Sequence, residues 1–176
     1  MSEFLGMTVQ IDLMRTVAAR PAEAFETVSD VMEWPLIIGS VRSVELLTPG
    51  PVDEGSQLRV SRFLFGRETT QQLEVASLEP PRRLLLFVKD PDIHFELDHV
   101  IDGVFGGGSR IMLIFRSRPK TQVGKAAHPF MSPFMEITLR DELEEDLLDL
   151  ATAVTLRSAV GGNDGSRSRQ STKTKS

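Results

Sequence analysis

The chain has 176 residues, of which 40% are hydrophobic and 26% are charged, and these values are ordinary for one soluble globular domain. It contains no cysteine, which excludes disulfides, thiolate nucleophiles and thiolate metal sites and agrees with the reducing cytoplasm, where we expect the protein. No apolar run approaches the roughly 18 residues of a membrane-spanning helix, and the N-terminus lacks the pattern of a signal peptide, so we expect no stable membrane insertion.

The formal net charge of −5 is unevenly distributed along the chain. The segment Ser158–Ser176 carries four cations and one anion, a net of +3, so the residues before it carry −8. An acidic body argues against a nucleic-acid-binding surface. The segment after residue 157 is also rich in Gly, Ser and Thr and has no apolar periodicity. We therefore predict one domain over residues 1–157 and a disordered basic tail over residues 158–176.

The first part of the chain predicts one strand and two short helices. Residues Thr8–Val17 alternate between apolar and polar side chains, as in a half-buried strand. Pro21 fits the first position of a helix, where no backbone N–H is needed. Pro35 disfavours helical backbone at Trp34, so we expect a break there and a second short helix that ends near Gly39.

The middle of the chain consists of strand-like segments separated by turn residues. The predicted strands are Val41–Leu47, Gln57–Phe65, Arg67–Leu78, Arg83–Lys89, Ile93–Gly103 and Arg110–Arg118. Short connections between them favour an antiparallel meander. The segment Arg83–Lys89 is apolar on both faces, so we expect it in the centre of the sheet or covered on both sides.

A loop is predicted to follow Pro119 and to run to Pro129, and one long amphipathic helix comes after it. Apolar residues recur every three or four positions from Met135 to Val154, which assigns the helix to Pro133–Arg157. The acidic residues assigned to its solvated face are Glu142, Glu144, Glu145, Asp146 and Asp149. The predicted fold is α+β, with a curved antiparallel sheet of about seven strands around this helix and an apolar pocket between them.

This order of elements resembles the START-like superfamily with the helix-grip fold, also called SRPBCC. The residues that carry the resemblance are Ile11–Val17, the helix entry Ala19–Phe25, Ser29-Asp30, Trp34-Pro35, Val41 and Val44. The resemblance extends from Thr8 to Arg157 and is nearest to the branch that groups polyketide cyclases/dehydrases with lipid-transport proteins. It implies a pocket for a hydrophobic ligand, but kinship of fold specifies chemistry poorly.

Two histidines on one predicted strand point in different directions. His94 and His99 are five residues apart, an odd separation, so they lie on opposite faces and cannot share a metal ion. His99 shares its face with apolar residues such as Leu97 and is the polar candidate inside the pocket. Such a histidine is most often a satisfied core residue; the alternative is a ligand hydrogen bond or proton transfer. We expect no metal site and no cofactor.

Three arginines are candidates for an inward-facing cation. Arg15 lies on the apolar face of the first strand and could meet an anionic group at the pocket mouth, although such a side chain more often extends to solvent. Arg59 and Arg62 lie on opposite faces of their strand, and the mixed alternation leaves open which one points inward. The residues expected to contact a ligand are Trp34, Phe95, Leu97, Leu113, Phe115, Phe134, Met135 and Leu139.

Two functions fit this pattern. The first is binding of a hydrophobic or amphipathic small molecule, such as a lipid, an isoprenoid or a polyketide-like compound. The alternative is an enzyme resembling a polyketide cyclase/aromatase or dehydratase, with His99 and Arg15 as the catalytic pair. The almost entirely apolar lining favours binding over catalysis. A third possibility is an interaction module, and the sequence does not indicate an oligomeric state.

Overall fold

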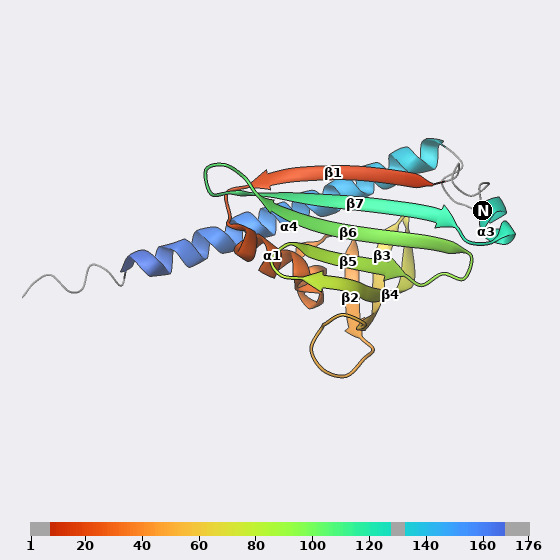
Figure 1. Cartoon of the computed structure of the whole chain (residues 1–176), viewed down its shortest axis with the longest axis horizontal. Coiled ribbons are helices and arrows are strands. Elements are labelled where there is room, and N and C mark those ends of the chain that lie inside the picture. Colours follow the sequence, from red (N-terminus) through yellow and green to blue (C-terminus); the bar gives the residue numbers. More distant parts are fainter. Residues whose placement is uncertain (1–7, 128–132, 168–176) are drawn as a thin grey trace, which may run out of the picture.

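The computed structural model describes residues 8–127 and 133–167. Its elements in chain order are β1 (Val9–Val17), α1 (Pro21–Ser29), the 3-10 helix η2 (Val31–Glu33), α2 (Trp34–Ile37), β2 (Val41–Leu46), β3 (Gln57–Leu64), β4 (Arg67–Glu79), β5 (Arg83–Val88), β6 (Ile93–Gly103), β7 (Ser109–Pro119), α3 (Gln122–Ala127) and α4 (Pro133–Arg167). Figure 1 shows a curved sheet laid over the long helix α4, with α1 and the short helices beside that helix. The predicted helix-grip α+β fold is confirmed.

The sheet contains seven strands in the order β1-β7-β6-β5-β4-β3-β2, and every pairing is antiparallel. Strands β2 to β7 form the predicted meander. Strand β1 adds to the edge of β7, with Val9 opposite Ser117 and Val17 opposite Ser109. Strand β5 takes the central position, as the apolar residues on both of its faces predicted.

The core lies between the concave face of the sheet and one side of α4. Ile11 of β1, Val28 of α1 and Ile111 of β7 are fully buried in one group of side chains that also includes Leu147 of α4. A second group, formed by strands β2 to β5 and the short helices, meets α4 at Leu150. Both groups therefore depend on the same helix to close them.

The β3–β4 connection is a tight turn of two residues, Phe65 and Gly66, with φ angles of 53° and 72°. Positive φ at both central positions matches the right-handed twist of a hairpin, and glycine adopts it readily. Phe65 has a side chain, so its conformation must be supported by its surroundings.

A short helix, α3, replaces part of the loop predicted between Pro119 and Pro129. It packs closely against the β5–β6 turn, where Thr121 Oγ1 donates a hydrogen bond to Asp92 Oδ1 at 2.6 Å. A Cβ atom on Gly124 would lie 2.1 Å from the carbonyl oxygen of Asp92, so only glycine allows this approach. Residues 128–132, which include the end of the predicted loop at Pro129, lie outside the described residues.

Helix α4 continues to Arg167, whereas the sequence assigned it to Pro133–Arg157. Residues 158–167 of the expected tail are therefore helical, and residues 168–176 lie outside the described residues. Extending an existing helix adds one hydrogen bond for each residue that is fixed, so the glycines at 161 and 162 weaken the end of α4 without stopping it. None of the described helices combines the length and apolar composition needed to cross a membrane.

Candidate functional site

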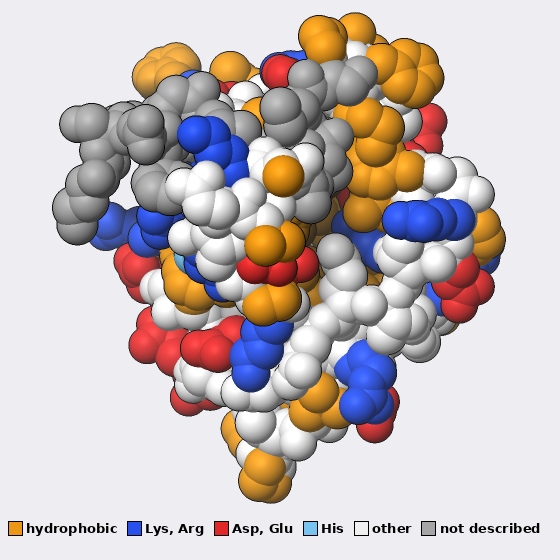
Figure 2. All heavy atoms as spheres, turned by 90° about the vertical axis from the view of Figure 1, so that its right-hand side faces the viewer, with side chains coloured by type: hydrophobic (Ala, Val, Ile, Leu, Met, Phe, Trp, Pro, Cys, Tyr) orange, Lys and Arg blue, Asp and Glu red, His pale blue; other side chains and the backbone are white. Residues whose placement is uncertain are grey.

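A cavity of about 750 Å³ lies between the concave face of the sheet and α4. Its walls come from strands β2 to β7, from α2 and from the first half of α4. Its lining includes Asp90 and Asp92 of the β5–β6 turn and Met135 near the start of α4, and these two parts of the fold lie at the right-hand end of the molecule in Figure 1. Figure 2 faces this end and shows hydrophobic and basic side chains beside a hollow.

Most of the side chains expected in the pocket line this cavity. They are Trp34, Phe95, Leu97, Leu113, Phe115, Met135 and Leu139. Phe134 is not among them and is 72% exposed. Successive residues of a helix are rotated by about 100°, so the inward direction of Met135 turns Phe134 away from the cavity. The binding role of the lining residues stays a prediction.

His99 is the buried histidine of the cavity wall and is only 2% exposed. Its ring centroid lies 5.5 Å from that of Trp34, whose Nε1 donates a hydrogen bond to the carbonyl of Val28 at 3.1 Å. Burial lowers the pKa of His99 to about 4, while Asp98 and the backbone of Leu84 oppose the change. The ring is therefore neutral near pH 7. Its Nδ1 atom has no hydrogen-bond partner among the described residues.

The polar end of the cavity is formed by Arg62 of β3 and Asp146 of α4, which make a buried ion pair. Their side chains are 11% and 7% exposed. Ser40 joins them: its hydroxyl donates to Asp146 Oδ1 at 2.7 Å and accepts from Arg62 Nη2 at 3.0 Å. Arg62 Nε has no partner among the described residues. Arg62 is thus the inward arginine that the sequence left open, and Arg59 pairs outside with Glu45.

Glu142 lies one helical turn before Asp146 and ties α4 to the β3–β4 turn. Its Oε1 accepts a hydrogen bond from the backbone N–H of Phe65 at 2.8 Å, which supports the positive φ of that residue. Burial raises the pKa of Glu142, although the Phe65 N–H and Arg62 act in the opposite direction. Its Oε2 is buried and has no partner among the described residues.

Arg15 is placed away from His99. Its Nη2 donates to Glu144 Oε1 of α4 at 3.1 Å, with side chains 39% and 46% exposed. It does not belong to the lining of the cavity. Strand β1 is the edge strand over the acidic side of α4, and Glu144 therefore attracts this guanidinium. The structure brings His99 together with Arg62 around one cavity, and not with Arg15.

The sequence assigned Asp146 to the solvated face of α4. This prediction was wrong, because Asp146 is buried and only 5% exposed. Asp146 lies three residues after Leu143 and four before Leu150, within the apolar stripe of the helix. A carboxylate inside an apolar stripe, combined with an arginine on a facing strand, is the pattern that could have indicated the pair.

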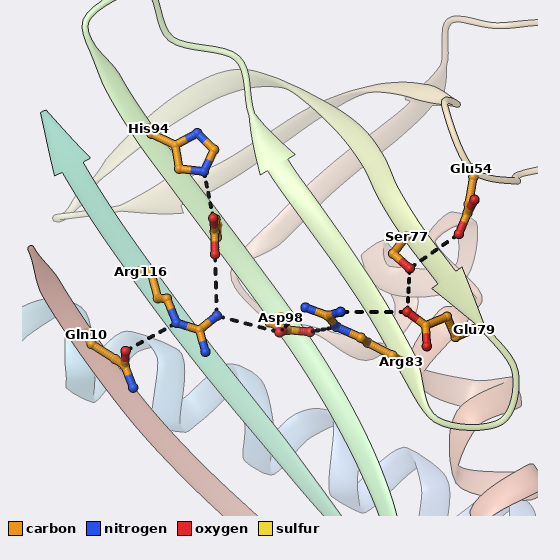
Figure 3. Close-up of polar contacts among 9 residues, drawn as sticks. Gln10, Glu54, Ser77, Glu79, Arg83, His94, Asp98 and Arg116 are labelled. Carbon is orange, nitrogen blue, oxygen red and sulfur yellow. Dashed lines mark hydrogen bonds and ion pairs between the residues drawn. The ribbon is translucent and has the colours of Figure 1, made fainter. Parts of the chain in front are cut away.

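The opposite face of β6 carries a network of charged side chains (Figure 3). Asp98 receives two hydrogen bonds of 2.9 Å from Arg83 of β5, and Arg116 of β7 lies 3.6 Å from it. Glu96 joins His94 to Arg116. His94 and His99 thus lie on opposite faces, as predicted. Within residues 8–127 and 133–167, no three His, Asp or Glu side chains are grouped as metal ligands.

The burial of His99 predicts a pH dependence of stability. Above its ordinary pKa of 6.5 the histidine is neutral in the folded and the unfolded chain. As the pH falls from 6.5 to about 4, the unfolded chain binds a proton that the folded chain does not. The free energy of unfolding should therefore fall over this range, by up to about 3 kcal/mol.

Urea unfolding of the wild type and of His99→Phe at about pH 7 and about pH 4.5 measures this contribution. The variant should lose less stability between the two pH values than the wild type does. Identical pH dependence in the wild type and His99→Phe would show that burial does not hold His99 neutral.

Comparison with known proteins agrees with this architecture. The aromatase/cyclase Zhui from Streptomyces sp. R1128 is 17% identical with a TM-score of 0.69, and the match covers 85% of this chain and 95% of that one. A START superfamily protein from Mycobacterium smegmatis is 16% identical with a TM-score of 0.63, covering 85% and 97%. Ara h 8.0201 is 14% identical with a TM-score of 0.64, covering 84% and 97%. At these identities the likeness shows the fold alone.

The family of the chain is assigned from its sequence. No curated protein matches this sequence. Residues 8–155 match the profile of a family described as polyketide cyclase/dehydrase and lipid transport, and this range includes the whole sheet and all cavity-lining residues. The chain therefore belongs to the polyketide cyclase/dehydrase and lipid-transport family.

Proposed function

We propose that the chain binds a hydrophobic or amphipathic small molecule, of lipid, isoprenoid or polyketide-like character, between α4 and the sheet. The observation that carries this proposal is the cavity of about 750 Å³ with predominantly apolar walls. Ligand sites in proteins commonly occupy about 300–1,000 Å³ and combine apolar walls with a few polar groups. Removing apolar ligand surface from water contributes about 25 cal/mol per Å², so burial alone gives such a ligand substantial affinity.

A second function, polyketide cyclase or dehydratase-like catalysis, is favoured by two polar groups in the same cavity. His99 is neutral and has an unpartnered ring nitrogen, so it has the form of a general acid or base. Arg62 Nε, which has no partner among the described residues, is an N–H donor at the wall that could hydrogen-bond a carbonyl oxygen of the substrate. It takes the role that the sequence gave to Arg15. Conversion of a poly-β-ketone probe by the wild type and not by His99→Ala would favour catalysis; binding without conversion would favour the first function.

Substitutions along α4 test whether the cavity is the binding site. Leu139 lines the cavity and Leu148, on the same helix, is 51% exposed. Leu139→Trp places an indole ring in the space that the ligand would occupy. We expect it to weaken binding of a fluorescent apolar probe such as 1-pyrenebutanol at least about tenfold.

Leu148→Trp adds the same side chain outside the cavity and should bind the probe as the wild type does. Circular dichroism and urea unfolding show whether each variant is folded. Unchanged probe affinity in folded Leu139→Trp would count against binding in this cavity.

A further inference from the structure

The charges around the cavity are unequal. Its lining contains two arginines, Arg62 and Arg67, and four carboxylates, Asp90, Asp92, Glu96 and Asp146. Arg116 and His94 contact Glu96 from the outer face of the sheet. If Glu96 is left out of the count, the lining still has three carboxylates and two arginines. His99 adds no charge near pH 7. Among these lining side chains, carboxylates therefore outnumber arginines, and this excess disfavours entry of an anion.

The one buried cation of the lining is already neutralised. The guanidinium of Arg62 pairs with Asp146 and also donates to Ser40. A carboxylate or phosphate that reached Arg62 would have to displace Asp146 or share the cation with it. Either arrangement leaves a carboxylate charge without full compensation at a buried position, which is strongly unfavourable. Glu142, beside the same pair, adds a further carboxyl group.

The unpartnered buried atoms match an uncharged hydroxyl group. Arg62 Nε is a donor without a partner among the described residues, so it needs an acceptor. His99 Nδ1 is a donor or an acceptor according to its tautomer, and it too has no partner in that part of the chain. A hydroxyl both donates and accepts, so it can satisfy either atom without bringing a charge.

We propose that the cavity selects uncharged, hydroxyl-bearing apolar molecules and rejects carboxylates and phosphates of the same size. This inference rests on the proposed binding function and names the ligand class for that site. Apolar walls supply the affinity, and the paired state of Arg62 supplies the discrimination.

Two probes that differ only in the head group test this selection, 1-pyrenebutanol and 1-pyrenebutanoate. Pyrene fluorescence titrations of the full-length wild type near pH 7.5 should give a dissociation constant at least about tenfold lower for the alcohol. Equal or tighter binding of the carboxylate would overturn the inference and leave the proposed function standing. Binding of neither probe would overturn the proposed function, and the inference with it.

Asp146→Asn releases the charge of Arg62 while keeping a side chain that accepts hydrogen bonds. It should tighten binding of 1-pyrenebutanoate at least about tenfold and change binding of 1-pyrenebutanol less than about threefold. Glu145→Gln removes the same charge from an exposed position of the same helix and should change neither. An equal gain in Glu145→Gln, or no gain in folded Asp146→Asn, would contradict the role of the Arg62–Asp146 pair. If Asp146→Asn does not fold, the affinities of the wild type for 1-pyrenebutanol and 1-pyrenebutanoate decide whether the cavity selects uncharged ligands.

Discussion

Asp146→Ala is expected to lower the free energy of unfolding by about 3–5 kcal/mol, measured by urea or guanidinium denaturation near pH 7. The substitution leaves Arg62, whose side chain is 11% exposed, without its partner. It also removes the acceptor of the Ser40 hydroxyl. A buried guanidinium without a counter-charge loses hydration that nothing replaces, and this loss exceeds that of an ordinary hydrogen bond.

An exposed ion pair provides the control for this prediction. Arg59 and Glu45 have side chains 52% and 60% exposed, so Glu45→Ala should cost no more than about 1 kcal/mol. The double variant Arg62→Leu/Asp146→Leu replaces the pair with apolar side chains and should be more stable than Asp146→Ala. A cost below about 1 kcal/mol for Asp146→Ala would mean that Arg62 is solvated and that the polar end of the cavity is open.

Leu147→Ala is the second substitution with a large expected effect. Leu147 is fully buried where α4 contacts β1, α1 and β7, and it does not line the cavity. Truncating such a leucine removes transfer free energy and leaves a hole among fixed neighbours, so we expect a loss of about 2–5 kcal/mol. Thermal and denaturant unfolding both report it.

Leu139→Ala is the matched comparison, two helical turns earlier on the same side of α4. Leu139 is also buried, but it borders space that is already empty. It has fewer packed neighbours to lose, so its truncation should cost at least about 1 kcal/mol less than that of Leu147. Equal costs at the two positions would indicate that the space beside Leu139 is filled by side chains.

The sequence predicted most of the fold because each element has a local cause. The alternation in Thr8–Val17 defines a strand with one buried face, and Pro21 marks the start of a helix. Arg83–Lys89 is apolar on both faces and lies in the centre of the sheet, as expected. The C-terminal end of α4 was not predicted, because breakers such as Gly161 lower helix propensity but do not fix where a helix ends.

The sequence predicted the apolar lining residues of the candidate site but not its buried ion pair. Which face of a strand or helix is buried follows from periodicity, so Leu113, Phe115 and Leu139 were found. Arg62 and Asp146 are 84 positions apart in sequence, and the mixed alternation around Arg62 left the direction of its side chain open. Only the register between β3 and α4 brings them together, and that register is a property of the tertiary structure.

Methyl NMR of the wild type with 1-pyrenebutanol tests the central claim most directly, because it reports on named leucines inside and outside the cavity. Binding in the cavity should produce large shifts at Leu97, Leu113 and Leu139, which line it, and none at the exposed Leu148. Saturable binding that shifts Leu148 and leaves the three lining leucines unchanged would contradict a ligand site between α4 and the sheet.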